Sequence, residues 1–191
     1  IVVGSVLLEV SGEGMLEVRY GEYTEELFAP KELELSWYRF PCDSFQIHQE
    51  CSLTSSGRRA FRYLRLIPSG KIMLKKLAAL HEEYPLQKTF SFQCSDHRLN
   101  DIWSLCANTT RLCMHDYYED GVKRDTFLWI GDARVQAQCG YRLFGDTELA
   151  RRSLRMIANS QRRDGAVPAC AARGCDPANY ERVRYLFRDH D

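Results

Sequence analysis

The feature that most constrains this fold is a change of hydrophobic period near residue 85. Before that point apolar and polar residues mostly alternate, and after Pro85 apolar residues recur every three or four positions. Alternation is typical of strands, whereas a period of about 3.6 is typical of amphipathic helices. The sequence therefore predicts a multi-domain α+β chain, with an antiparallel β-sandwich over residues 1–84 and a helical domain over residues 85–191.

The first part is predicted to contain short strands separated by Gly, Ser and Pro, a rhythm typical of β-sandwiches. The expected strands lie at residues 6–10, 15–20, 45–48 and 59–66. The first two flank Ser-Gly-Glu-Gly at 11–14, which predicts a hairpin, and the last lies between turn signals at 54–57 and 68–70. Residues 71–84 are ambiguous, because their Leu-Ala-Ala-Leu core favours a helix while the preceding rhythm favours a final strand.

Three helices are predicted in the second part, each with a single apolar stripe. The stripe of the first helix consists of Leu99, Ile102, Trp103, Cys106 and Thr110. Ser95 or Asp96 can cap this helix. The second helix is expected over 132–144, where Gly145 is a natural stop and Asp146 a natural cap for the third. Such stripes cannot close a core by themselves, so we expect either the sandwich or further helices beyond this chain to cover them.

Composition and charge exclude several classes of function. Lys and Arg number 26 and Asp and Glu number 26, so no nucleic-acid or anionic-membrane partner is indicated. No apolar run approaches the roughly 20 residues that span a bilayer, and the scattered histidines predict no metal site and no cofactor. The eight cysteines form no Cys-x-x-Cys pair. We expect them to be reduced and structural, which favours a cytoplasmic location.

Residues 117–132 carry the densest chemistry of the chain, with four carboxylates, two cations and Trp129 between two predicted helices. Carboxylates can accept hydrogen bonds from sugar hydroxyls, an aromatic face can pack on a sugar ring, and burial raises the pKa of an acid. The opposing interpretation is structural. The charges could pair in solvent at little net energy, Trp129 could pack in a core, and Asp132 could cap a helix. Composition alone leaves both interpretations open.

The spacing within this segment resembles the acid motif of the bacterial inverting α-L-rhamnosidases. One form of that motif reads Asp-Gly-x-Lys-Arg-Asp-Arg-x-x-Trp-x-Gly-Asp. The run Glu119-Asp120-Gly121-x-Lys123-Arg124-Asp125-x-x-x-Trp129-x-Gly131-Asp132 keeps its two spacings, four residues from the acid to Trp and seven from the acid to the last Asp. Two positions depart from the family, because Asp125 replaces the more common Glu and Thr126 stands where a cation is usual.

The resemblance covers most of the chain. Residues 57–65 resemble the end of the family's β-sandwich domain, residues 100–103 resemble its first catalytic-domain helix, and residues 164–169 resemble its Asp-Gly-x-x-Pro loop. Residues 173–191 do not resemble the family, and either a truncated or frame-shifted tail or a divergent one explains them. We therefore expect a fragment that holds the end of the β-sandwich and the first helical hairpins of an incomplete (α/α)6 barrel.

The resemblance implies a glycoside hydrolase that removes terminal α-L-rhamnose by inversion, with Asp125 as the general acid. The residues implied to bind rhamnose are Glu119, Asp120, Arg124, Trp129 and Asp132. The leading Asp of the motif corresponds to either Glu119 or Asp120. The family's general base is a Glu on a much later helix, and Glu148 is better explained as a first-turn residue that complements a helix dipole. We therefore expect the isolated chain to be inactive.

Two alternatives stay open beside this interpretation. One is a non-catalytic carbohydrate-binding or remnant fragment, and the other is a different (α/α)6 glycosidase that acts on uronic acids or glucosides. The implied partner is a rhamnose-containing glycoside or oligosaccharide, and a homodimer is left open.

Overall fold

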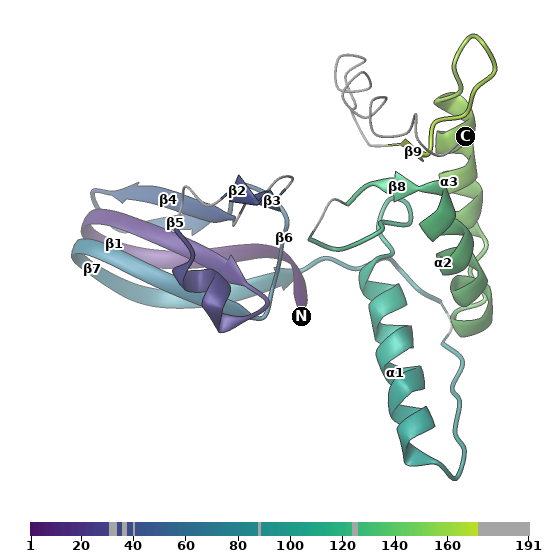
Figure 1. The fold of residues 1–191 in the computed structure, drawn as a ribbon. Coiled ribbons are helices and arrows are strands. Elements are labelled where there is room, and N and C mark those ends of the chain that lie inside the picture. Colours follow the sequence, from purple (N-terminus) through teal and green to yellow (C-terminus); the bar gives the residue numbers. More distant parts are fainter. Residues whose placement is uncertain (31–33, 36–37, 40, 88, 124–125, 172–191) are drawn as a thin grey trace. The chain divides into compact units, whose positions relative to one another are not determined.

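The computed structural model describes residues 1–30, 34–35, 38–39, 41–87, 89–123 and 126–171. The chain divides between Glu82 and Glu83 into two compact units, the first built from strands and the second mainly from helices (Figure 1). This α+β composition, with an antiparallel β part followed by helices, is confirmed.

The first unit is an antiparallel sheet organised around one long strand, β1 (Val2–Gly21). On one side, β7 (Tyr63–His81) pairs with β1 along almost its whole length. On the other side, β1 pairs in succession with three shorter strands, β6 (Arg59–Phe61), β5 (Cys51–Thr54) and β4 (Cys42–Ile47). The other described elements of this unit are the 3-10 helix η1 (Thr24–Phe28) and the paired strands β2 (Glu34–Leu35) and β3 (Tyr38–Arg39).

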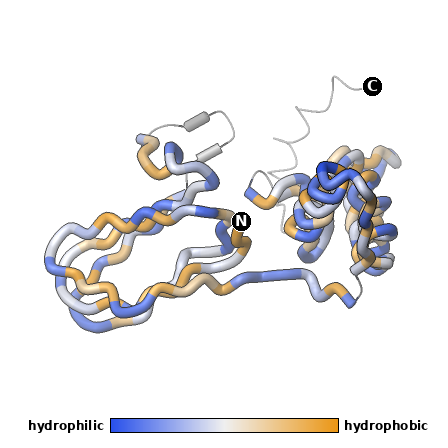
Figure 2. Tube along the Cα trace, turned by 90° about the horizontal axis from the view of Figure 1, so that it is seen from below, coloured by the Kyte–Doolittle hydropathy of each residue, from blue (hydrophilic) through white to orange (hydrophobic). Residues whose placement is uncertain are grey.

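The core of this unit lies on one face of β1, as the alternation of side chains along a strand dictates. Hydrophobic and hydrophilic residues alternate along the paired strands (Figure 2), and the buried side chains of the two halves of β1 share one face. The core comprises Val6, Leu8, Val10, Leu16, Val18, Tyr20, Ile47 and Phe61. Because a slip of one residue would expose this whole set, the core also determines the register of β1 with its partners.

The hairpin expected at residues 11–14 is wrong, because β1 continues through them without a turn. Gly12 and Gly14 have φ values of +122° and +142°, and a Cβ atom at either position would collide with the backbone of β7. The turn expected at 68–70 is wrong for the same reason, since Gly14 pairs with Gly70 inside β7. Glycine within these strands marks a close approach of two backbones rather than a turn.

The remaining strand expectations have mixed outcomes. The ambiguous segment 71–84 is a strand for most of its length, because β7 extends to His81. The segment expected as one strand at 59–66 is divided at Arg62 between β6 and β7. The turn expected at 54–57 is confirmed, since the chain leaves β5 and enters β6 there.

A buried carboxylate connects β4 to β1 and to the turn before β6. Asp43 is 5% exposed. Its carboxylate accepts hydrogen bonds from the hydroxyl of Tyr20 at 2.7 Å, the hydroxyl of Ser56 at 2.5 Å and the guanidinium of Arg59 at 2.8 Å. Burial by itself raises the pKa of Asp43, but the three hydrogen bonds outweigh burial and hold that pKa below its usual range. The sheet tolerates this buried charge because both carboxylate oxygens have donors.

The described part of the second unit contains three helices, α1 (His97–Leu112), α2 (Ile130–Leu143) and α3 (Glu148–Asn159). Two short strands, β8 (Leu128–Trp129) and β9 (Cys170–Ala171), pair antiparallel. The core of this unit gathers side chains from the segment after α1, from β8 and from α2 and α3. Its most buried members include Met114, Tyr118, Leu128, Leu143, Phe144 and Leu149.

The helix signals in the sequence act as expected at most helix ends. Asp96 caps α1 by accepting a hydrogen bond from a backbone N–H of its first turn at 2.9 Å. Gly145, with a φ of +63°, follows the end of α2, and Asp146 accepts a backbone hydrogen bond at 3.1 Å from the first turn of α3. However, α2 begins at Ile130, so Asp132 lies inside its first turn and does not cap the helix.

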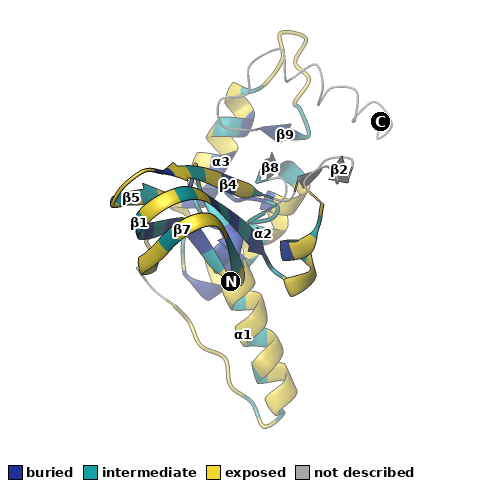
Figure 3. Cartoon of the chain, turned by 90° about the vertical axis from the view of Figure 1, so that its left-hand side faces the viewer, coloured by how far each residue is buried: buried dark blue, intermediate teal, exposed yellow. Residues whose placement is uncertain are grey.

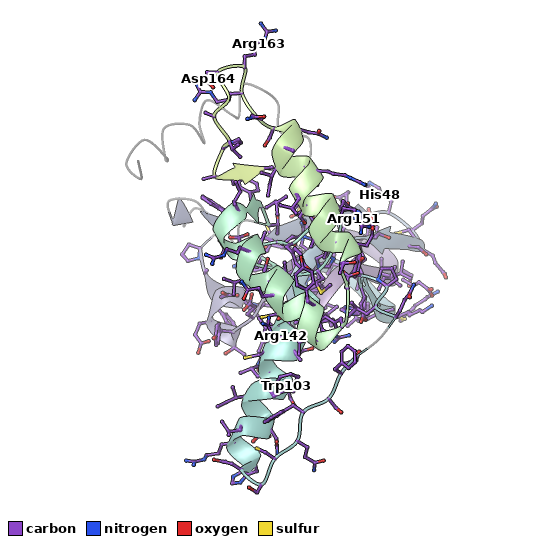
Figure 4. All side chains as sticks on the ribbon, turned by 90° about the vertical axis from the view of Figure 1, so that its right-hand side faces the viewer. His48, Trp103, Arg142, Arg151, Arg163 and Asp164 are labelled. Carbon is purple, nitrogen blue, oxygen red and sulfur yellow. The ribbon has the colours of Figure 1, made fainter. Side chains whose placement is uncertain are left out.

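The apolar stripe of α1 is largely exposed within the described part of the chain (Figure 3). Leu99 and Ile102 are 49% and 55% exposed and Cys106 is exposed, whereas Thr110 is buried. Trp103, labelled on α1 in Figure 4, contacts Phe92 with ring centroids 5.2 Å apart. Among the described residues, the three helices therefore do not cover one another's apolar stripes completely. The sequence predicts this, because helices with a single apolar stripe each cannot close a core by themselves. None of the described helices combines the length and the apolar character needed to cross a membrane.

Replacing Asp43 by Ala is expected to lower the free energy of unfolding by about 3 kcal/mol, because Arg59 would keep its charge in a largely buried site without this partner. Urea denaturation of the chain measures the loss. Glu9→Ala is the matched control, since the Glu9–Lys76 pair is exposed and worth less than about 1 kcal/mol. Equal losses in the two variants would contradict the importance of the buried pair.

The same carboxylate is expected to make stability depend on pH. The pKa of Asp43 is lower in the folded chain than in the unfolded chain, so its contribution is complete above the unfolded pKa of about 3.9. That contribution is lost as the pH falls through the lower folded-state pKa. Urea midpoints of the wild type and Asp43→Asn, measured from neutral to acidic pH, should differ at neutrality and converge at the acidic end.

Gly14→Ala is expected to destabilise the sheet by about 2 kcal/mol, because its φ of +142° disfavours a side chain and its Cβ would lie 2.1 Å from the carbonyl oxygen of Ser69. Gly57→Ala is the control, since a Cβ there meets no heavy atom nearer than 3.9 Å. Thermal unfolding followed by circular dichroism compares the two variants. Matching melting temperatures would contradict the close approach of β1 and β7.

Candidate functional site

Four of the six predicted site residues lie within the described part of the chain, in the stretch between the end of α1 and the first turn of α2. They are Glu119 and Asp120 in the connection, Trp129 in β8 and Asp132 in α2. Arg124, predicted to bind substrate, and Asp125, predicted to be the general acid, lie outside the described residues. The segments on either side of these two residues therefore carry the geometry of the site.

The connection begins with a compact turn directly after α1. The backbone N–H of Glu119 donates to the carbonyl of Cys113 at 2.9 Å. Met114 and Tyr118 pair as an isolated β-bridge and are 0% and 1% exposed. The backbone N–H of Tyr118 donates to the hydroxyl of Ser153 on α3 at 3.3 Å. The turn is therefore fixed to the core of the helical unit before the predicted site residues begin.

A loop from Asp120 to Phe127 follows this turn, and two hydrogen bonds join its ends. The backbone N–H of Asp120 donates to the carbonyl of Phe127 at 3.1 Å. The backbone N–H of Phe127 donates in return to Oδ1 of Asp120 at 3.2 Å. We call this reciprocal pair the loop clasp. It joins the two ends of the sequence segment that contains Arg124 and Asp125.

Thr126, which directly follows Asp125 in the sequence, has a φ of +64°. This left-handed conformation is rare for a β-branched residue and costs about 1–2 kcal/mol. The hydroxyl of Tyr117 donates a hydrogen bond to the carbonyl oxygen of Thr126 at 3.0 Å. Backbone strain of this kind persists only where the surrounding structure holds it, and it is enriched at functional sites.

A hydrogen bond from Gln136 connects α2 to the connection after α1. The side-chain amide of Gln136 donates to the backbone carbonyl of Glu119 at 2.6 Å. Gln136 lies one helical turn after Asp132 on the same face of α2, so this bond places the first turns of α2 beside the connection. The Glu119 residue is only 4% exposed, whereas Asp132 is exposed. Asp132 is thus the more accessible of these two carboxylates.

Trp129 is held in place by the pairing of β8 with β9. It lies opposite Cys170 in the register of the two strands. The backbone N–H of the next residue, Ile130, donates to the carbonyl of Ala169 at 2.9 Å. Trp129 is half-buried, neither fully packed in the core nor fully exposed. The packing and the substrate-contact interpretations are therefore compatible for this residue.

A tight turn at Asp164 and Gly165 leads the chain back toward β8, and Figure 4 shows Asp164 at the tip of the loop after α3. The Asp164 carboxylate accepts a hydrogen bond from the Arg162 guanidinium at 2.6 Å and from the backbone N–H of Ala166 at 3.2 Å. Gly165 has a φ of +88°, a conformation that favours glycine. The polar groups of this Asp-Gly segment thus close the turn that delivers β9 to β8.

The phenol of Tyr118 packs the base of the connection against α2. A Cβ atom on Gly140 would lie 2.6 Å from its hydroxyl oxygen, so this position requires glycine. Burial, followed by the charge of Asp146, raises the pKa of Tyr118. Its hydroxyl has no hydrogen-bond partner among the described atoms. Tyr118 therefore packs as a buried, neutral side chain beneath the connection.

Sequence reasoning missed the residues that hold the connection in place. Tyr117 and Phe127 belong to no motif, and nothing in the sequence indicates a left-handed conformation at Thr126. Gln136 could have been found, because it interrupts an otherwise apolar stripe and a buried amide needs partners. Across the described ranges, no group of three or more His, Cys, Asp or Glu residues could hold a metal ion.

Comparison with protein families matches residues 87–181 to the bacterial alpha-L-rhamnosidase 6 hairpin glycosidase domain. The match starts close to the boundary between the two units and includes all six predicted site residues. No curated protein matches the chain.

Three solved structures share the fold of the chain. A rhamnosidase from Klebsiella oxytoca with rhamnose bound has a TM-score of 0.83 and 23% identity, over 92% of this chain and 37% of its own. A GH78 family rhamnosidase of Bacillus sp. GL1 has a TM-score of 0.69 and 30% identity, over 83% of this chain and 17% of its own. An alpha-L-rhamnosidase from Dictyoglumus thermophilum has a TM-score of 0.68 and 20% identity, over 89% of this chain and 20% of its own. The chain thus spans 37% or less of each of these proteins.

Thr126→Gly is expected to raise the free energy of unfolding by about 1 kcal/mol, because glycine adopts a left-handed φ without the steric cost that Thr126 bears. Urea denaturation of the chain measures the change. The matched control is Thr109→Gly in α1, where the same substitution at an exposed helical position should cost about 0.3–0.5 kcal/mol. Destabilisation of similar size in both variants would contradict strain at Thr126.

Proposed function

We propose a function from the family to which the chain belongs, that of the bacterial α-L-rhamnosidase six-hairpin glycosidases. In this proposal the chain forms the acid-bearing part of a glycoside hydrolase that removes terminal α-L-rhamnose. The observation that carries the proposal is the loop clasp, which joins the ends of the segment containing Asp125. A loop with fixed ends can present one side chain repeatedly at one place, which proton transfer requires.

The proposed reaction is a single displacement with inversion. Such a reaction needs two carboxyl groups about 6.5–9.5 Å apart, one to protonate the leaving oxygen and one to deprotonate the attacking water. Asp125 is the proposed acid, so the bond to the anomeric carbon breaks as its proton passes to the leaving oxygen. To stay protonated near neutrality, Asp125 needs a raised pKa, through desolvation and neighbouring carboxylates such as Asp120 and Asp132.

Rhamnose is proposed to bind beside Trp129 and Asp132. The half-buried ring of Trp129 offers an apolar face, and the exposed carboxylate of Asp132 can accept hydrogen bonds from sugar hydroxyls. The rhamnosidase with rhamnose bound shares its fold over 92% of this chain, which supports a rhamnose-containing glycoside as the substrate. Arg124 and Asp120 are proposed as further ligands, and buried Glu119 is the least accessible of the proposed set.

The general base is proposed to lie outside these 191 residues. Glu148 occupies the first turn of α3 and pairs with Arg151 at 2.5 Å, as expected of a carboxylate that complements a helix dipole. The chain spans 37% of the Klebsiella oxytoca protein and 17% of the Bacillus protein, so a later helix can supply the base.

The proposal also includes the cellular compartment and the oligomeric state of the protein. The eight cysteines form no Cys-x-x-Cys pair, and we propose that they are reduced in a cytoplasmic compartment. Sedimentation velocity of the purified protein determines whether it forms the homodimer that the sequence leaves open.

Asp125→Asn, made in the complete product of the gene that encodes this chain, is expected to lower kcat for α-L-rhamnosides by about 10²–10⁴-fold. Asparagine has nearly the size of aspartic acid but no acidic proton to give. The loss should be larger for an alkyl aglycone than for 4-nitrophenol, because nitrophenolate leaves with less help from an acid. Steady-state kinetics measure both losses, and Glu148→Gln is the control carboxylate, with kcat expected to stay unchanged.

The outcomes of this experiment separate the alternatives. We expect the isolated chain of 191 residues to show no turnover, and turnover that Asp125→Asn abolishes would contradict a base outside the chain. Hydrolysis of glucosides or uronides without hydrolysis of rhamnosides would contradict the substrate. Sugar binding without any hydrolysis would favour a carbohydrate-binding protein. NMR detection of the β anomer as the first product tests inversion.

A further inference from the structure

We propose that Tyr117 is a positioning residue for the general acid, because Tyr117 and Asp120 together hold the peptide unit between Thr126 and Phe127. This inference rests on the proposed function and deepens it. It concerns how the backbone beside Asp125 in the sequence is controlled, and it assigns Tyr117 no contact with the substrate.

The peptide unit between Thr126 and Phe127 is held at both of its polar groups. Its carbonyl oxygen, on Thr126, accepts the hydrogen bond from the Tyr117 hydroxyl at 3.0 Å. Its N–H, on Phe127, donates to Oδ1 of Asp120 at 3.2 Å. The C=O and N–H of a trans peptide point in opposite directions, so the two bonds hold the plane from opposite sides. The plane cannot rotate without breaking at least one of them.

Tyr117 can act as an anchor because its own position is fixed. It is 7% exposed and belongs to the buried core of the helical unit. Its backbone carbonyl accepts a hydrogen bond from the N–H of His115 at 3.2 Å, and the next residue, Tyr118, is bonded to Ser153 on α3. The phenol hydroxyl therefore reaches Thr126 from a rigid base, in contrast to a hydroxyl on an exposed side chain.

The hydroxyl of Tyr117 bonds the residue whose backbone most needs support. Thr126 has a φ of +64°, which is disfavoured for a β-branched residue. Without the hydrogen bond to its carbonyl, the backbone at Thr126 would relax toward the ordinary negative φ. That relaxation would rotate the chain at the residue adjoining Asp125 in the sequence and would shift the loop relative to β8.

The identity of the predicted acid makes this backbone control more important. Asp125 has one methylene fewer than the Glu that is more common at this position of the motif. It therefore has fewer side-chain torsions with which to correct a displaced backbone. A general acid must approach the leaving oxygen to about 2.6–3.2 Å, and an error of about 1 Å can cost on the order of 100-fold in rate. In this proposal, the held peptide unit between Thr126 and Phe127 compensates for the shorter side chain.

The test compares two tyrosine variants in the complete gene product. Tyr117→Phe removes only the hydroxyl that bonds Thr126. Tyr84→Phe is the matched control, because the Tyr84 hydroxyl donates to Asp146 at 3.0 Å in the same unit but outside the connection. We expect both variants to melt at similarly reduced temperatures. We expect kcat to fall about 10-fold in Tyr117→Phe alone, with KM changed by less than about twofold.

Two further measurements separate positioning from a general loss of stability. The loss of kcat in Tyr117→Phe should be larger for an alkyl aglycone than for 4-nitrophenol, since only the alkyl aglycone depends strongly on a well-placed acid. The effect of Tyr117→Phe should also shrink by at least about threefold in a Thr126→Gly background, because glycine adopts a left-handed φ without the steric cost that the Tyr117 hydrogen bond offsets.

Each failure has a distinct signature. An unchanged kcat in Tyr117→Phe, equal losses of kcat in both tyrosine variants, or a loss independent of the aglycone overturns the positioning role and leaves the proposed function intact. A wild-type product that cleaves no rhamnoside overturns the proposed function, and the inference with it. The rate of trypsin cleavage after Lys123, within the loop, measures how firmly the loop is held and does not depend on an activity assay. Faster cleavage in Tyr117→Phe than in Tyr84→Phe supports the inference, and equal rates overturn it.

Discussion

In the helical unit, two hydrogen bonds fix the peptide unit between Thr126 and Phe127, directly before the chain enters β8. Tyr117 bonds its carbonyl and Asp120 bonds its N–H, and both anchors belong to the connection after α1. That connection is bonded in turn to α3 through Ser153 and to α2 through Gln136. Since β8 starts directly after Phe127 and runs into α2, the way the loop closes determines the direction in which the rest of the site continues.

The carboxylates named in the two units differ in burial. Asp43 in the sheet is 5% exposed and bonded to a hydroxyl, a phenol and a guanidinium, so it stabilises the fold and is closed to ligands. In the helical unit, Asp120 is half-buried and Asp132 is exposed. A carboxylate can bind a sugar hydroxyl only if the sugar reaches it, so among the proposed substrate ligands Asp132 and Asp120 are more accessible than Glu119.

Local sequence patterns predicted the features that depend on residues close together in the sequence. The change of period near residue 85, the cap at Asp96 and the stop at Gly145 are of this kind. Features that depend on distant partners could not be predicted. Gly12 and Gly14 look like a hairpin in a short window, and only their pairing with β7 shows a close approach of backbones. Likewise, α2 begins earlier than expected, at Ile130, whose backbone N–H bonds to a distant residue just before β9. The left-handed conformation of Thr126 has no sequence signal, because its steric cost is offset by a hydrogen bond from Tyr117, nine residues earlier in the sequence.

The loop clasp also bears on the alignment that motif spacing left open between Glu119 and Asp120. Glu119 contributes its backbone carbonyl to Gln136, and its side chain is buried. Asp120 closes the loop with its carboxylate and precedes Gly121, the Asp-Gly order of the motif. A longer glutamate at 120 would have to fold back to reach the Phe127 N–H while its own N–H stayed on the Phe127 carbonyl. The geometry therefore favours Asp120 as the leading carboxylate of the motif, because its short side chain closes the loop.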